Sequence, residues 1–180
     1  MADVLAASRV GAGTLYVAAL GSTLPTDLAT AWDAAWVEVG YTEAGHEFEI
    51  TPTFEDIEVA EELSPIATYE TARNYNVRFN MAEYTAANLK TAFNGGTITA
   101  GTGIVTFEPP DAGVFTEVML GWEATDAFQR RVWKRCIQTG TITVTQNKAP
   151  NRASIPVDFR VLIPTDNSAP WFEIIDDDYQ

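Results

Sequence analysis

Apolar and polar residues alternate with a period of two over much of the chain, as in strands that bury one face. The alternation is clearest from Thr68 to Met81, where aromatic and aliphatic side chains share one face with Thr71. Glu, Asn and Arg side chains occupy the other face, and only Arg73 interrupts the apolar one. The segment is therefore predicted to form a long, half-buried strand.

An earlier stretch changes from strand periodicity to helix periodicity. Residues 10–18 are small and β-prone, which predicts an entry strand. Leu28, Trp32 and Trp36 then recur every four residues. This spacing predicts a short helix or helical turn that buries both tryptophans, followed by a strand over residues 37–41.

An acidic segment, residues 42–65, precedes the long strand. Its apolar residues, such as Phe48 and Ile50, alternate with carboxylates, as in strands with one solvated face. Pro52 and Pro65 interrupt the alternation, and proline is tolerated mainly at sheet edges. We therefore expect a long acidic hairpin or loop at an edge.

One further helix is predicted at about residues 85–94, with Thr85 as its cap and Leu89 and Phe93 on its apolar face. Short β-rich pieces with turn residues between them fill the remainder: 97–100, 104–108, 114–124, 128–138, 141–146 and 155–163. The predicted fold is mainly β, a sandwich or barrel with one flanking helix. The expected core includes Trp32, Trp36, Tyr75, Val77, Phe79, Leu89 and Phe93.

The chain is long enough for one domain. Its 180 residues, 46% hydrophobic and 20% charged, can bury a single core, with arms expected at residues 1–9 and 165–180. No apolar run reaches the length of a membrane span, and the first residues lack the features of a signal peptide, so synthesis in the cytoplasm is expected. The single cysteine, Cys136, cannot form an internal disulfide.

Charge is distributed unevenly along the chain. The net charge is −14, yet residues 10–72 hold twelve acidic and no basic side chains, whereas residues 126–160 hold seven basic and two acidic ones. Oppositely charged surfaces favour head-to-tail assembly of copies. The alternative is that these charges are simply the solvated faces of strands. The negative overall field disfavours binding to nucleic acid.

No catalytic constellation stands out. His46 is the only histidine, which excludes multi-histidine metal sites and disfavours Ser-His-Asp and Cys-His arrangements, and we expect it to be solvated. Cys136 alternates with Val132 and is expected to be buried in the core. Neighbouring cations and Trp133 also make residues 131–137 a weak candidate for a nucleic-acid patch. No cofactor or metal is expected.

Residues 32–45, with the sequence WDAAWVEVGYTEAG, resemble major tail tube proteins of long-tailed phages, especially phages of actinobacterial hosts. The order of predicted elements agrees over nearly all of the chain. The resemblance implies a non-catalytic sandwich or barrel-like subunit that forms hexameric rings stacked into a hollow tube, through which DNA leaves the capsid. It also implies location in the virion tail, contact with tape measure and tail terminator proteins, and loops or arms that link subunits.

Contacts between subunits are expected from the acidic hairpin, the basic segment and the apolar patch near the C-terminus. The candidate residues are Glu43, Glu47, Glu49, Glu55, Asp56, Glu58, Glu61, Glu62, Arg130, Arg131, Lys134, Arg135, Trp171 and Phe172. Replacing the four basic residues by glutamate is expected to slow tube formation. An acidic wall would let DNA slide without tight binding.

Other functions remain open from the sequence. The chain could be a tail terminator, a baseplate protein or a contractile-tube subunit, all virion parts with a related fold. It could instead be a monomeric carbohydrate-binding β-sandwich that uses an exposed Trp133 or Trp171. An enzyme is disfavoured by the missing constellations.

Overall fold

The computed structural model describes residues 11–144 and 153–176. This part of the chain is mainly β, with antiparallel strands and one short helix, as predicted. The elements are β1 (Gly13–Ala19), β2 (Val37–Glu38), β3 (Thr42–Ile57), β4 (Ala67–Met81), α1 (Ala86–Ala92), β5 (Thr97–Gly101), β6 (Ile104–Glu108), β7 (Val118–Ala124), β8 (Gln129–Gln138), β9 (Ile155–Val161) and β10 (Trp171–Ile175).

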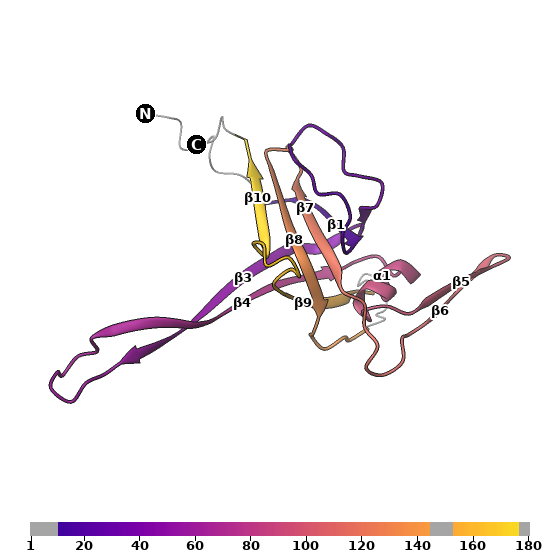
Figure 1. The fold of residues 1–180 in the computed structure, drawn as a ribbon. Coiled ribbons are helices and arrows are strands. Elements are labelled where there is room, and N and C mark those ends of the chain that lie inside the picture. Colours follow the sequence, from indigo (N-terminus) through magenta and orange to yellow (C-terminus); the bar gives the residue numbers. More distant parts are fainter. Residues whose placement is uncertain (1–10, 145–152, 177–180) are drawn as a thin grey trace.

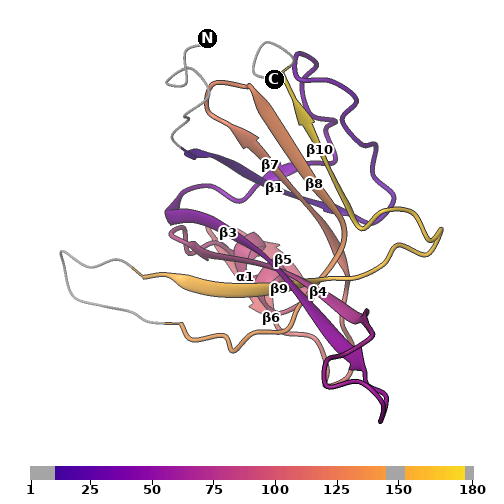
Figure 2. The same ribbon diagram turned by 90° about the vertical axis from the view of Figure 1, so that its left-hand side faces the viewer.

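The main sheet has the order β2-β1-β7-β8-β9-β4-β3, with β10 also paired to β8, and every pairing is antiparallel. The path is open, since β2 and β3 lie at its two ends. Strands β5 and β6 form a separate hairpin. Figures 1 and 2 show the sheet folding over, so that β3, β4 and β9 form one layer and β1, β7, β8 and β10 the other.

A bulge in β8 allows this fold. Leu120 pairs with Trp133 and Val118 with Cys136, so three steps along β8 match two along β7. On its other edge, β8 pairs with β10 before the bulge and with β9 after it. Because a bulge bends and twists its strand, β8 can pass from one layer to the other.

The core lies between the two layers. Its buried residues are Leu15, Val39, Val77, Phe79, Met81, Ala92, Leu120, Trp122, Ala124, Trp133, Cys136, Ile155, Val157, Phe159 and Val161. Val77 and Phe79 are buried as predicted, and Tyr75, Leu89 and Phe93 are partly buried against this cluster. Two sheet layers that bury their facing sides against each other form a β-sandwich.

The predicted helix over Leu28 to Trp36 is wrong, because residues 24–36 form an irregular loop. The Asp27 carboxylate accepts the Ala29 and Thr30 amides at 2.9 and 2.6 Å, which caps a turn and lowers the pKa of Asp27. The carbonyls of Asp27 and Thr30 accept from the guanidinium of Arg130. These bonds replace the amide donors that a helix would supply.

Both tryptophans nevertheless pack against the molecule, as predicted. The loop covers the outer face of β1, β7 and β8, where Trp36 is buried and Trp32 partly buried in a second apolar cluster. A Cβ at Gly121 would lie 2.6 Å from the Trp32 ring, so the close approach of the loop requires glycine there. This loop therefore forms a third layer over the sandwich.

Three other predictions need correction. The strand expected over 37–41 is only Val37–Glu38, because Gly40 takes a positive φ of 86° and the Tyr41 amide bonds to Glu83. Residues 141–144 form no strand, and 145 and 146 lie outside the described residues, as does the expected arm 1–9. The acidic hairpin does not close within 42–65, because β3 pairs with β4 as far as Met81.

The helix prediction is confirmed. The Thr85 hydroxyl caps α1 by accepting the Asn88 amide at 3.1 Å. Asn88 is buried and donates to the carbonyls of Val39 and Glu83, which ties the helix to the chain leading into β3 and to the segment after β4.

Candidate assembly site

The outer part of the β3–β4 hairpin, residues 50–73, projects from the sandwich (Figure 1). We call it the arm. Nearly all of its residues are exposed. Its exposed large apolar side chains are Ile50, Phe54, Ile57, Leu63, Ile66 and Tyr69. Since a two-stranded hairpin is marginally stable in water, burial of these side chains against a partner would stabilise the arm.

The arm is also strongly acidic. Six carboxylates lie between Ile50 and Arg73, and Arg73 is the sole cation of that segment. Arg73 is bound by Glu70, and its hydrogen bonds lower the pKa of that carboxyl. The carboxylates at the tip of the arm therefore have no cation beside them on the arm itself.

The hairpin brings together the acidic candidates from the sequence. Glu43, Glu47 and Glu49 lie on the part of β3 that joins the sandwich, and the others lie on the arm. Glu49 pairs with Arg78 at 2.5 Å, and Arg78 also binds Asp158 at 2.9 Å. The structure does not bring any of these carboxylates to the four basic candidates.

The basic candidate Arg130 is buried and binds other parts of its own subunit. Its guanidinium donates to Glu123 at 2.9 Å and to the carbonyls of Asp27 and Thr30 at 2.8 and 2.7 Å. It also lies 5.3 Å from the centre of the Trp32 ring. Its side chain is 4% exposed, so it holds the covering loop against β7 and β8.

The other three cations likewise have partners on the same chain. The remaining contacts are Arg131 to Glu173 at 2.6 Å, Lys134 to Ser168 at 3.1 Å, and Arg135 to Glu117 at 2.7 and 2.8 Å. A pairing with the acidic hairpin of a neighbour would have to exchange these bonds. That pairing stays a prediction, and replacing all four cations would also disturb the subunit itself.

The apolar candidates Trp171 and Phe172 pack on their own subunit through β10. The Trp171 ring lies 5.2 Å from that of Phe48, and Lys134 lies 5.8 Å from the Phe172 ring. Both side chains are partly buried. Residues 171–175 of the expected C-terminal arm thus form a strand of the main sheet.

Open sheet edges are a further assembly feature. Strand β3 ends the main sheet, and the hydrogen-bonding edge away from β4 has no neighbouring strand among the described residues. At the other end, β2 pairs only with Tyr16 and Val17 of β1. The β5–β6 hairpin adds exposed Ile98, Ile104 and Val105. Such edges readily pair with another chain.

One layer of the sandwich has a polar outer face that could not be recognised from the sequence. The outer face of β3, β4 and β9 is polar, with Asn74, Asn76, Arg78, Asp158 and Arg160 side by side in register. Within the described residues no loop covers it as the loop over residues 24–36 covers the other layer. The alternation along β4 indicates its polar side, but it cannot identify the strands that pair with β4.

His46 is partly buried between aromatic rings, contrary to the prediction that it is solvated. Its ring lies 5.0 Å from the Trp122 ring and 5.5 Å from the Trp133 ring. Burial, together with the charge of Arg131, lowers its pKa from 6.5 to about 4. The imidazole is therefore uncharged at neutral pH and acts as a core side chain.

The described residues offer no metal centre and no reactive thiol. They contain no group of three His, Cys, Asp or Glu side chains placed to hold a metal ion. Cys136 is fully buried, as predicted, and burial raises the pKa of its thiol. No helix in this part of the chain is both long and apolar enough to cross a membrane.

The exposed acidic arm and the open strand edges of this β-sandwich are typical of a structural protein that associates with other chains. A sequence model described as phage tail tube protein matches residues 4–180. The chain therefore belongs to a phage tail tube protein family. No curated protein matches the chain.

Proposed function

We propose that the subunit forms rings, hexameric as the resemblance implies, which stack into a tail tube that conducts the genome into the host. The observation that carries this proposal is the arm, which exposes Leu63 completely and Phe54 to 57%. An isolated monomer gains nothing from this apolar surface. A neighbouring copy that buried it would stabilise both the arm and the assembly.

Rings close through asymmetric contacts between the two open ends of the sheet. The edge of β3 faces one neighbour and the β1–β2 edge the other, so that main-chain hydrogen bonds continue from subunit to subunit. The edges that would promote aggregation of a monomer are then satisfied within the ring.

The polar outer face of β3, β4 and β9 forms the wall of the channel. Arg78 is compensated because it binds Glu49 and Asp158, whereas Arg160 keeps its charge and donates to the neutral amide oxygen of Asn74 at 2.7 Å. A single arginine without an ion pair among the described residues of this face attracts phosphates only weakly, and the net charge of −14 opposes a polyanion. DNA would therefore pass without tight binding.

The wider context follows from the same role. The subunit is made in the cytoplasm of the host, which the resemblance suggests is an actinobacterium, and ends in the tail of the virion. A tape measure protein occupies the channel during assembly, and a terminator protein caps the tube. The whole chain, 1–180, acts as one domain, and no catalytic step is involved.

The carbohydrate-binding alternative required an exposed tryptophan ring at Trp133 or Trp171. Trp133 is fully buried and Trp171 packs on Phe48, so neither presents the exposed ring that the alternative required. No large exposed apolar residue among those described is a tryptophan.

Shortening the arm tests the proposal. Replacing residues 52–73 by Asn-Gly joins Thr51 to Asn74, which stand opposite each other in the hairpin. We expect this variant to keep the circular dichroism of a folded sandwich but to form no tubes, whereas the parent forms rings that stack into tubes in electron micrographs. Tubes formed equally well by the shortened chain would contradict the role of the arm.

A further inference from the structure

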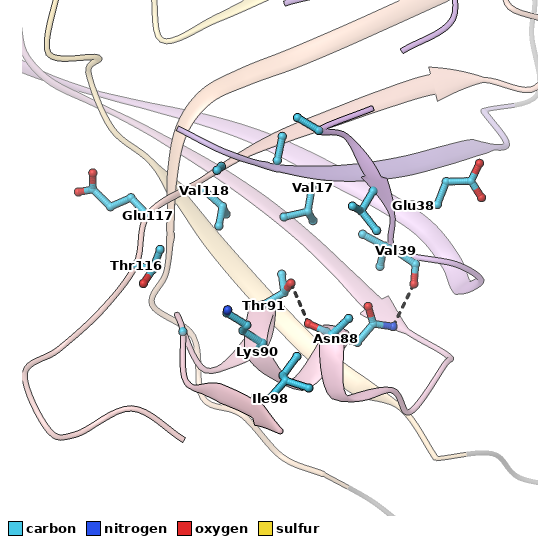
Figure 3. A pocket seen from close by; sticks show the side chains of 16 residues that line it. Val17, Glu38, Val39, Asn88, Lys90, Thr91, Ile98, Thr116, Glu117 and Val118 are labelled. Carbon is cyan, nitrogen blue, oxygen red and sulfur yellow. Dashed lines mark hydrogen bonds between the residues drawn. The ribbon is translucent and has the colours of Figure 1, made fainter. Parts of the chain in front are cut away.

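A groove lies where α1 meets the ends of β1, β2 and β7. Its volume is about 400 Å³, and most of the surface that lines it is apolar. Figure 3 shows Val17, Val39, Ile98 and Val118 among its lining side chains, with Lys90 and Thr91 of α1 on one side. A cavity of this size accommodates a few apolar side chains.

The groove and the arm lie on opposite sides of the molecule. In Figure 1 the arm extends to the lower left, while α1 and the β5–β6 hairpin lie to the right. Figure 2 agrees, because the arm points towards the viewer and these elements lie behind it. The arm of a subunit therefore cannot fill the groove of the same subunit.

We propose that the groove receives the tip of the arm of a second copy. The tip, residues 58–66, carries Leu63, which is completely exposed, and Ile66, which is 57% exposed. These side chains match an apolar groove that the described chain leaves open. The arm extends roughly 23 Å from Ile50 to Ile57, since seven strand steps of about 3.3 Å each separate these two residues.

Charge supports the same occupant. Lys90 lines the groove and has no ion-pair partner among the described residues. Two carboxylates, Glu38 and Glu117, also line the groove, and Glu117 is held by Arg135. Glu38 lies at the other end of the groove from Lys90 (Figure 3), so an acidic tip would turn towards Lys90 and away from Glu38. Glu61 and Glu62 directly precede Leu63 on the arm. When Leu63 enters the groove, these carboxylates come close to Lys90, which fixes the orientation of the tip.

The contact is heterologous, because two different surfaces meet. A heterologous contact repeats from copy to copy, and it either closes into a ring or leaves an arm free at one end of an open series and a groove free at the other. It thereby links subunits in series, either around a ring or from ring to ring. This inference rests on the proposed assembly into a tube, and it assigns the surface on which the arm binds.

Variants of the full chain with one added cysteine test the contact. Ser64→Cys places a thiol on the tip beside the unchanged Leu63 and Thr91→Cys places one in the groove, while the native Cys136 is fully buried. Each variant is mixed with the other under assembly conditions and treated with a short bismaleimide. Thr165→Cys, on the exposed β9–β10 loop, replaces Thr91→Cys in the matched control.

We expect a covalent dimer from the Ser64→Cys and Thr91→Cys mixture and none from the control mixture. A chain carrying both cysteines should give a ladder of cross-linked oligomers. Tubes that form without the specific cross-link would overturn the groove contact and leave the tube itself standing. Absence of both tubes and cross-links would overturn the contact and the proposed assembly together.

Discussion

Arg130 gives the sharpest quantitative prediction about the subunit. The change is Arg130→Met, which keeps much of the length of the side chain and removes its charge. It deletes the bond to Glu123 and the two bonds to the carbonyls of Asp27 and Thr30. The Arg130 side chain is 4% exposed and that of Glu123 is 17% exposed, so the surviving carboxylate is left largely without solvent.

Removing one partner of a buried ion pair costs roughly 3 to 5 kcal/mol. Arg78 provides a matched control, since it also binds two partners, Glu49 and Asp158, but is 41% exposed. Exposed pairs contribute only about 0 to 1 kcal/mol, so Arg78→Met should be nearly neutral. The free energy of unfolding falls by about 2 kcal/mol per molar urea, so a loss of about 4 kcal/mol lowers the midpoint of urea unfolding by about 2 M.

The assay is urea unfolding of each full chain, followed by tryptophan fluorescence, at concentrations where light scattering shows no assembly. Because Arg130 holds the loop that carries Trp32, Arg130→Met should also shift the native emission to the red. Equal midpoints for the two variants, or an unchanged native spectrum for Arg130→Met, would refute the role given to this guanidinium.

Three further predictions concern buried positions. Gly121→Ala should destabilise the subunit by about 1 to 3 kcal/mol in urea unfolding, because its methyl group would meet the Trp32 ring. In the folded chain the pKa of His46 is lowered from 6.5 to about 4. Between these two pH values the unfolded chain is protonated at His46 and the folded chain is not, so the free energy of unfolding should fall as pH drops from about 6.5 towards 4. His46→Gln should remove that part of the slope, and an unchanged slope would contradict the burial. Cys136 should react with a maleimide at pH 8 only after denaturation, and rapid labelling of the native chain would show that the thiol is accessible.

Strands and the helix could be predicted from the sequence because local patterns decide them. The alternation from Thr68 to Met81 matches β4, and Thr85 caps α1 through its own side chain. Both signals act within a few residues, so a single sequence contains them.

The loop over residues 24–36 could not be predicted, because a distant residue decides its conformation. Trp32 and Trp36 have helical spacing, but Arg130, about a hundred residues later, binds the carbonyls that a helix would need. His46 was misjudged for the same reason, since Trp122 and Trp133 bury it from other strands.

The residues of the candidate site could be predicted from the sequence, but the strands and side chains that pair with them could not. The acidic hairpin was expected, yet its second strand turned out to be β4, which lies beyond Pro65. Alternation identifies the faces of a strand but not its neighbours, so the internal partners of Arg131 and Arg135 and the groove beside α1 could be found only in the structure.

Assembly of the purified chain tests the central claim most directly. A concentration series followed by light scattering after size exclusion, with electron microscopy of the same fractions, measures whether the subunit is complete alone. We expect monomer at low concentration and uniform rings or tubes as concentration rises. A chain that stays monomeric throughout, with its arm and strand edges still exposed, would contradict the tail tube function.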